Sequence, residues 1–217
     1  MLIYRLHRTT MSSICIYCGS SFGNDPAFLE AAIRMGTSLA KGGHTLVYGG
    51  GNVGLMGAVA DAALAAGGDV IGVIPEMLAE RELAHDRLTT LHTVLTMHER
   101  KFRMAELSDG FIAMPGGIGT LEEIIEIFVW SQLGVHTKPC GILNISGFYD
   151  PLLACLEHMT SAQFLSAAHF SQLLVDDDPE VLLQRLLAFR PAAQGKWIER
   201  VSRDTSLAQS TQCDGRC

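Results

Sequence analysis

Short apolar runs rich in β-branched residues alternate with segments of helical periodicity through most of the chain. This alternation is typical of βαβ units, in which helices connect the parallel strands of one sheet. We expect seven strands, at Ile14–Tyr17, Thr45–Tyr48, Val70–Ile74, Thr89–Leu95, Gly110–Met114, Cys140–Ile145 and Gln172–Val175. The pattern therefore predicts an α/β fold on an open parallel sheet with right-handed crossovers.

Helices are predicted between these strands. Asp25 and Pro26 supply an N-cap and a first-turn proline, and Gly42 and Gly43 end the helix that follows. The other helices are expected at Leu55–Ala66, from Met97, from Leu121, at Tyr149–Met159 and at Pro179–Phe189.

The predicted elements occupy residues 14–190, and a chain of 217 residues suits one domain with a substantial core. Residues 1–13 are interpreted as an N-terminal extension and residues 191–217 as a loose, polar C-terminal tail. The extension lacks the pattern of a signal peptide, and no apolar run reaches membrane-spanning length. We therefore expect a cytoplasmic protein with no membrane partner. The formal charge of −7 disfavours a nucleic-acid partner, which requires a concentrated basic face.

Two of the six cysteines, Cys15 and Cys18, form a C-x-x-C pattern. They lie in a strand-like run, where residues three apart point to opposite faces of the sheet. We expect two small buried side chains and no disulfide framework. His98 is a potential metal ligand, but no second ligand has a convincing spacing from it, so no metal is predicted.

Three predicted strands lead into glycine-bearing loops at the carboxyl edge, where open parallel sheets bind their ligands. The first loop carries Gly19 and Ser20, which allow close backbone approach and offer a hydroxyl to an anion, although turn statistics explain such a loop equally well. The second contains Gly49, Gly50 and Gly51 but lacks the Lys-Ser or Lys-Thr of a P-loop. Three consecutive glycines before a helix suit a phosphate held by backbone amides.

The third loop has the sequence P-G-G-I-G-T-L-E-E and leads into a predicted helix. Thr120 and Glu123 have the spacing of a capping box, in which each side chain accepts a hydrogen bond from a backbone amide. The apolar face of this helix comprises Leu121, Ile124, Ile125, Phe128 and Val129. Capping does not account for Gly116, Gly117 or Gly119, so we expect a ligand to approach that backbone closely.

Arg100 and Lys101 follow Thr96 and Glu99, which have the same capping-box spacing. Positive charges in the first turn of a helix oppose the macrodipole, at a cost of about 0.3 to 1 kcal/mol each where exposed. A solvated basic face is the commoner explanation of such a pair. Beside the glycine loops, however, an anion that offsets this repulsion is favoured.

The stretches M-H-E-R-K and P-G-G-I-G-T-L-E-E resemble the M-H-x-R-K and P-G-G-x-G-T-x-x-E motifs of the Lonely Guy (LOG) family. The similarity extends from Ile14 to Phe189 and includes the other two glycine loops. Members of this family are cytokinin riboside 5′-monophosphate phosphoribohydrolases, long mislabelled as lysine decarboxylases. The resemblance implies a Rossmann-like, doubly wound parallel sheet with helices on both faces in a single domain, and a homodimer.

The resemblance also implies hydrolysis of the N-glycosidic bond of a nucleoside 5′-monophosphate to the free base and ribose 5-phosphate, without a cofactor. Arg100 and Glu123 match the catalytic pair. Glu123 is suited to stabilise positive charge on the sugar and to orient or deprotonate water. For Arg100, contacts to the phosphate, the ribose or the leaving base stay open. The candidate substrate-binding residues are Gly19, Ser20, Gly50, Gly51, Glu82, Lys101, Gly116, Gly117, Gly119, Thr120 and Glu122.

Two other functions stay open on the sequence. A non-catalytic nucleotide or phosphoribosyl carrier needs the glycine loops but has no evident use for Glu123. Decarboxylation of an amino acid with pyridoxal phosphate needs a Schiff-base lysine. Of the four lysines only Lys101 lies near a candidate phosphate site, and it belongs to the M-H-E-R-K motif. The sequence does not distinguish AMP from a prenylated adenine nucleotide as the substrate.

Overall fold

The structure is a computed structural model that describes residues 12–79 and 84–191. Within these residues seven strands form one sheet in the order β4-β3-β2-β1-β5-β6-β7, and every neighbouring pair is parallel. The strands are β1 (Ser13–Tyr17), β2 (Thr45–Tyr48), β3 (Val70–Pro75), β4 (Thr90–Val94), β5 (Gly110–Ala113), β6 (Cys140–Leu143) and β7 (Leu173–Asp176). All seven predicted strands and the parallel α/β fold are thus confirmed.

The described residues contain six helices of ten or more residues close to the predicted positions; five of them lie between strands, and the last follows β7. They are α1 (Pro26–Lys41), α2 (Gly54–Ala65), α4 (Met97–Leu107), α5 (Ile118–Gln132), α6 (Asp150–Ser161) and α8 (Pro179–Ala188). Three short elements were not expected, because so few residues show no helical period: α3 (Glu76–Ala79), η1 (Ile145–Gly147) and α7 (Ala167–Phe170). No helix in the described part of the chain is long and apolar enough to cross a bilayer.

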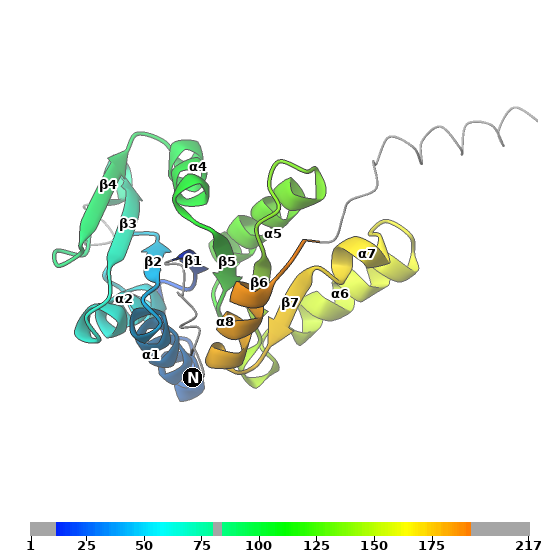
Figure 1. Ribbon diagram of the computed structural model, residues 1–217, viewed down its shortest axis with the longest axis horizontal. Helices are drawn as coiled ribbons and strands as arrows, with labels where there is room; N and C mark the ends of the chain where they lie inside the picture. Colours follow the sequence, from blue (N-terminus) through cyan, green and yellow to red (C-terminus); the bar gives the residue numbers. More distant parts are fainter. Residues whose placement is uncertain (1–11, 80–83, 192–217) are drawn as a thin grey trace, which may run out of the picture.

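The helices cover both faces of the sheet, with α1 and α8 on one side of the strands and α4 and α5 on the other (Figure 1). Alternate residues of β1 separate the two cores: Ile14 and Ile16 pack with α1, α2 and α8, whereas Cys15 and Tyr17 pack with α4, α5 and α6. Cys18 lies in the first core, so the two cysteines of the C-x-x-C pattern are buried free thiols on opposite faces, as predicted.

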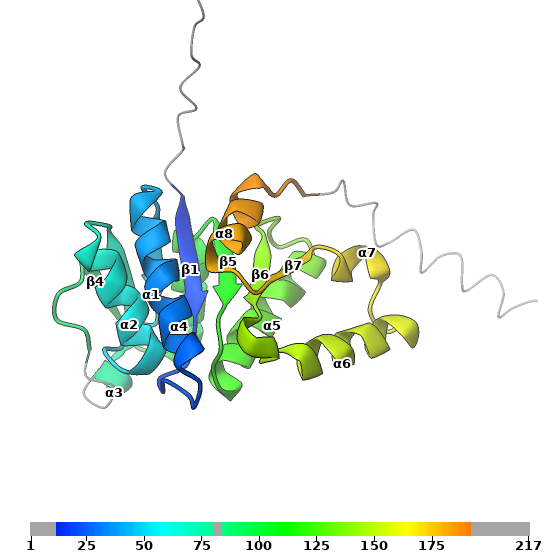
Figure 2. The same ribbon diagram turned by 90° about the horizontal axis from the view of Figure 1, so that it is seen from below.

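The order of the strands places two glycine loops next to each other. After β1 the chain adds β2, β3 and β4 on one side, and α4 then carries it back to β5 on the other side of β1. In Figure 2, β1 and β5 lie side by side and point the same way. Their loops meet at this reversal, where the Gly19 amide donates to the Pro115 carbonyl at 3.1 Å. Ligands of doubly wound sheets bind at such a reversal of strand order.

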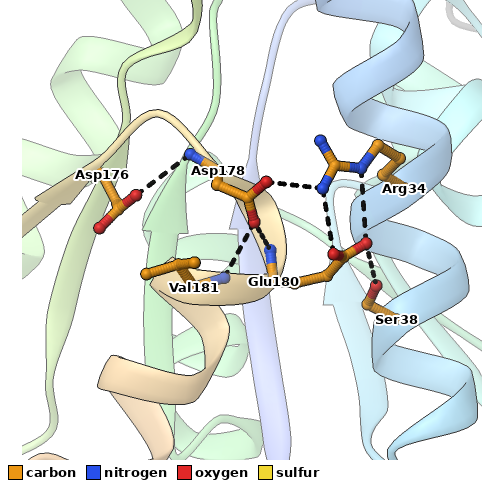
Figure 3. A network of polar contacts seen from close by, with 6 residues as sticks. All are labelled: Arg34, Ser38, Asp176, Asp178, Glu180 and Val181. Atoms are coloured by element: carbon orange, nitrogen blue, oxygen red, sulfur yellow. Dashed lines mark hydrogen bonds and ion pairs between the residues drawn. The ribbon is translucent and has the colours of Figure 1, made fainter.

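A cluster of charges ties the last helix to the first (Figure 3). Asp178 is the N-cap of α8, and its Oδ1 accepts hydrogen bonds from the amides of Glu180 and Val181 at 2.9 and 3.1 Å. Its Oδ2 accepts from the Arg34 guanidinium of α1 at 2.6 Å, and Arg34 also donates to Glu180 at 3.0 Å. Asp178 therefore both caps α8 and fixes it to α1.

Replacing Asp178 by Asn keeps a capping side chain but removes the charge. Hydrogen bonds from Arg34, and then from the Val181 and Glu180 amides, hold the pKa of Asp178 below its usual value. A carboxylate with a lowered pKa stabilises the fold above the unfolded value of about 3.9 and loses this effect as the pH falls through the folded value. We expect calorimetry to give a lower thermal midpoint for Asp178→Asn than for wild type at pH 7, with the difference vanishing at strongly acidic pH.

The exposed neighbour Asp177 provides the matched control. Asp177→Asn is expected to follow the wild-type thermal midpoint at every pH. A midpoint difference for Asp178→Asn that does not change with pH would contradict the stabilising pair with Arg34.

Candidate active site

Arg100 is held at the carboxyl ends of two strands. It lies in the first turn of α4, and its side chain is only 9% exposed. Nε donates to the Val73 carbonyl of β3 at 3.1 Å, and Nη2 donates at 3.4 Å to the carbonyl of Gly49, just after β2. A Cβ on Gly49 would lie 2.1 Å from the same Nη2, so glycine at this position makes room for the guanidinium.

The carboxylate nearest to this guanidinium is Glu123 of α5, whose Oε1 lies 3.6 Å from Arg100 Nη1. The Glu123 side chain is 12% exposed, so the pair is largely shielded from water. The sequence predicted that an anion offsets the positive charges at the start of α4. In the structure Glu123 and two strand-end carbonyls surround Arg100 with negative charge. The two candidate catalytic residues are therefore neighbours.

Lys101 makes the second link between α4 and α5. Its ammonium group bonds Glu122 and lies 3.0 Å from the carboxylate of Glu126. Burial lowers the pKa of Lys101, but the bonds to Glu122 and Glu126 outweigh that effect and raise it. Lys101 and Glu122, both expected to contact substrate, thus neutralise each other here. The sequence places Glu126 off the core of α5 but does not reveal its pairing with Lys101, although Glu126 lies one helical turn after Glu122 on the same face.

The N-cap of α4 is Thr96, as predicted, but Glu99 bonds the amide one residue before the one that a capping box uses. The Thr96 hydroxyl accepts a hydrogen bond from the Glu99 amide at 3.1 Å. The Glu99 carboxylate reaches back to the Leu95 amide at 2.9 Å. Since Arg100 follows Glu99 directly, this cap also sets the direction of the guanidinium.

The predicted capping box at Thr120 is wrong. Helix α5 begins at Ile118, three residues earlier than expected, with Gly117 as N-cap and no side-chain cap bond. Thr120 lies inside the first turn and is buried, and its Oγ1 would be 2.2 Å from a Cβ on Gly116. The absence of a side chain at position 116 thus allows Thr120 to pack inward and the helix to begin early. As a result Glu123 lies in the second turn of α5, facing Arg100.

Several glycines are explained by contacts between the loops. A Cβ on Gly19 would lie 3.3 Å from the Gly116 Cα, so the loops after β1 and β5 pack backbone to backbone. Gly54 has a φ of +55°, and a Cβ there would lie 2.3 Å from the Ser20 carbonyl carbon. Gly50 also has a positive φ, of +81°. Gly54 and Gly50 thus favour glycine whether or not a ligand binds, and Gly19 leaves little room for a side chain.

Gly117 and Gly119 are different, because nothing lies within 4 Å of a Cβ built on either and neither has a positive φ. The amides of Ile118, Gly119 and Thr120 belong to the first turn of α5, which offers them no intrahelical acceptor. No hydrogen bond from them to another residue is found within the described ranges. Exposed glycines beside unpaired amides at a helix N-terminus form a suitable site for an anion.

The N-terminus of α2 is less open. The amides of Leu55 and Met56 both donate to the Gly19 carbonyl, at 3.1 and 3.3 Å. Gly51 forms an isolated bridge with Ala84, and the Gly50 carbonyl accepts from the His85 amide. Binding of substrate by Gly50 and Gly51 stays a prediction, as it does for Gly19 and for Ser20, which is exposed. Glu82 lies outside the described residues.

A doubly wound parallel sheet with an open helix N-terminus at its reversal point defines a Rossmann-like α/β protein. A family model described as "Possible lysine decarboxylase" matches residues 56–186. The chain is 48% identical over 174 residues to the cytokinin riboside 5′-monophosphate phosphoribohydrolase of Rhodococcoides fascians, covering 80% of this chain and 88% of that protein. It is 46% identical to the enzyme LOG of Oryza sativa subsp. japonica, covering 73% and 66%. The chain belongs to this LOG family.

Solved structures with the same fold are more distant in sequence. A molybdenum cofactor binding protein from the phototrophic bacterium Rippkaea orientalis has a TM-score of 0.63 and 23% identity, with coverage of 82% of this chain and 97% of that chain. The molybdenum cofactor carrier protein of Chlamydomonas reinhardtii has a TM-score of 0.61 and 20% identity, with coverage of 83% and 100%. At these identities the likeness shows the fold alone.

The Gly119→Ala variant tests the anion site at the start of α5. Alanine stabilises a helix by about 0.5 to 1 kcal/mol relative to glycine, and there is room for the methyl group, so the thermal midpoint should not fall. The same methyl group would obstruct an anion at the amides. We expect AMP to bind about tenfold more weakly, measured by calorimetry.

Gly116→Ala is the matched comparison. Its methyl group meets the buried Thr120 hydroxyl, so this variant should lose stability. Unchanged AMP affinity in a stable Gly119→Ala protein would remove the start of α5 from the binding site.

Proposed function

We propose that the protein hydrolyses the N-glycosidic bond of cytokinin riboside 5′-monophosphates, and of AMP, releasing the free base and ribose 5-phosphate. The observation that carries this proposal is the position of Glu123 on the same helix as the open first turn. Glu123 follows Gly119 by four residues, or about one helical turn. A carboxylate and an anion site are therefore combined on one rigid element. Relatives named for this activity support the substrate class.

The chemistry fits these groups. Cleavage of a ribosyl C–N bond builds positive charge on the sugar, which a carboxylate at the anomeric carbon stabilises while it orients or deprotonates water. Glu123 has this role in our proposal, and Arg100 keeps its carboxylate in place. The amides of Ile118, Gly119 and Thr120 hold the 5′-phosphate. Binding of the phosphate then fixes the ribose in register with Glu123.

Acid–base catalysis supplies only part of the required acceleration. It accelerates a reaction by about 10²- to 10⁴-fold, whereas enzymes accelerate theirs by about 10⁶-fold or more, which corresponds to a barrier lowered by about 8 kcal/mol. The remainder is assigned to positioning through the phosphate and to fixed charges around the sugar. A substrate without the 5′-phosphate loses the positioning contribution. The proposed reaction is therefore expected to depend strongly on the 5′-phosphate of the substrate, and this dependence is its most direct test.

Lys101 does not suit the decarboxylase description of the family model. A Schiff base forms from a neutral amine, whereas the ion pairs with Glu122 and Glu126 raise the pKa of Lys101. Lys138 is also engaged elsewhere, since its ammonium group donates to the Ala105 carbonyl of α4 at 2.8 Å. Lys101 instead links α4 to α5 through its ion pairs with these two carboxylates.

We also propose a cytoplasmic homodimer that pairs through the outer sides of α4 and α5. These two helices lie on the same face of the sheet and are joined by ion pairs (Figure 1). Exposed large apolar side chains lie on both helices and just after α5: Met97 and Phe102 on α4, Val129 on α5, and Leu133 as its C-cap. Val129 belongs to the apolar face predicted from the sequence, yet it is not covered by the core. Exposed apolar surface of this kind is typical of protein interfaces, and two-fold dimers are the commonest assembly.

The glutamate variant Glu123→Gln tests the reaction. Gln keeps an oxygen that can accept from Arg100 but carries no charge, so we expect AMP binding to persist while base release falls by about 10²-fold or more.

Base release is followed chromatographically with AMP, isopentenyladenosine monophosphate and the two dephosphorylated nucleosides. Wild-type protein should act only on the monophosphates. Equal hydrolysis of nucleosides, or an unchanged rate in the variant, would refute the mechanism, and tight AMP binding by a wild-type protein without turnover would favour the carrier.

The substitution Phe102→Glu tests the interface. Phe102 is 56% exposed on α4, and a charge there should oppose pairing, so light scattering is expected to show a dimer for wild type and a monomer for the variant. Phe164 is 90% exposed in the turn between α6 and α7, away from α4 and α5, and Phe164→Glu should remain dimeric. A monomeric wild-type protein would contradict the proposal.

A further inference from the structure

Tyr149 makes a hydrogen bond to the strand end from which the P-G-G loop starts. It is the residue just before α6 and is only 2% exposed. Its hydroxyl donates to the Met114 carbonyl at 2.7 Å. Met114 directly follows β5 and directly precedes Pro115, so the hydrogen bond fixes the backbone at the start of the loop that leads to the proposed anion site.

The remaining bonds to this part of the loop come from the other side. The Met114 amide donates to the Tyr17 carbonyl at 2.8 Å, and the Pro115 carbonyl accepts from the Gly19 amide at 3.1 Å. Both partners belong to β1 or the loop after it. Tyr149 instead lies beyond β6, on the opposite side of β5 in the sheet. The loop is thus held from both neighbouring strands, and Tyr149 supplies the bond from the β6 side.

Tyr149 is itself firmly placed. Its amide donates to Asn144 Oδ1 at 2.7 Å, and Asn144 Nδ2 donates to Asp150 Oδ1 at 2.7 Å. The backbone between Asn144 and Tyr149 contains Ser146 with a φ of +52°, a conformation that a serine rarely adopts, followed by Gly147 at +70°. Strained backbone of this kind persists only where its surroundings enforce it, and it is concentrated near functional sites. The chain is therefore bent to present the tyrosine at this position.

We infer that Tyr149 is a positioning residue for the phosphate subsite. Through its hydrogen bond to the Met114 carbonyl, it fixes where the P-G-G loop leaves β5 and therefore where the first turn of α5 begins. The inference rests on the proposed function, because it assigns the open amides to the substrate phosphate. Glu123 lies about one turn further along α5 and is also held by Arg100 of α4, whereas the bond from Tyr149 acts first on the loop that leads into the helix. Loss of the tyrosine hydroxyl should therefore weaken phosphate binding more than it slows the chemical step.

The substitution Tyr149→Phe removes only the hydroxyl and keeps the ring, including its edge contact with Phe148 at 4.9 Å between centroids. We expect the Kd for AMP and for ribose 5-phosphate to rise about tenfold by calorimetry. The KM for AMP should rise by a similar factor, with kcat within about twofold of wild type. Asn144→Ser, which shortens the side chain that accepts from the Tyr149 amide, should shift the two Kd values in the same direction by a smaller factor.

Tyr48→Phe is the matched control. Tyr48 is likewise fully buried, but its hydroxyl has no hydrogen-bond partner among the described residues and its ring lies in the core on the other face of the sheet. This variant should bind AMP as wild type does. Wild-type Kd values in Tyr149→Phe, or equal weakening in Tyr48→Phe, would overturn the inference, as would a loss confined to kcat.

The Kd measurements distinguish a failure of this inference from a failure of the proposed reaction. If wild-type protein binds AMP without releasing base, the proposed function fails, and the comparison of Kd values still decides the role of Tyr149. If wild-type protein binds neither AMP nor ribose 5-phosphate, the phosphate subsite is absent and the inference is overturned with it.

Discussion

The arrangement of the site depends on how one buried guanidinium is neutralised. Arg100 lies at the positive end of a helix with little access to water, so its charge requires acceptors within the protein. These come from three separate elements: the Val73 carbonyl of β3, the Gly49 carbonyl after β2, and the carboxylate of Glu123 on α5. Breaking a buried ion pair typically costs about 3 to 5 kcal/mol. The ends of two strands and the starts of two helices are thus held together by one side chain.

Two sets of contacts then place the carboxylate and the open first turn of α5 near each other. Glu123 is placed by Arg100, whereas the open amides of α5 are placed by the packing of Gly116 against Gly19 and Thr120. Because both groups belong to one helix, they cannot drift apart as substrate binds. A site whose charges are fixed before the reaction needs little reorganisation during it, which is the main source of electrostatic catalysis.

The sequence predicts the features that depend on local pattern. All seven strands and the cap at Thr96 follow from residues close together in the chain. The start of α5 could not be predicted in this way, because the inward packing of Thr120 depends on a contact between the loops after β1 and β5. The need for glycine at Gly49 likewise comes from Arg100, 51 residues away. Glycine runs signal close approach, but only the fold distinguishes approach by a ligand from approach by the protein itself.

This distinction changes what the acidic residue means. Since Arg100 needs a counter-charge, Glu123 has a structural use even in a protein without catalytic activity, and its presence alone does not identify a hydrolase. The more informative feature is incomplete burial: its side chain is 12% exposed, on a helix whose first turn carries Gly119 in open space. A carboxylate fully sealed from solvent could not reach a ligand, so the remaining exposure is what a catalytic role requires. Under the proposed function, it is this partly accessible ion pair beside unpaired amides that acts on the bound sugar.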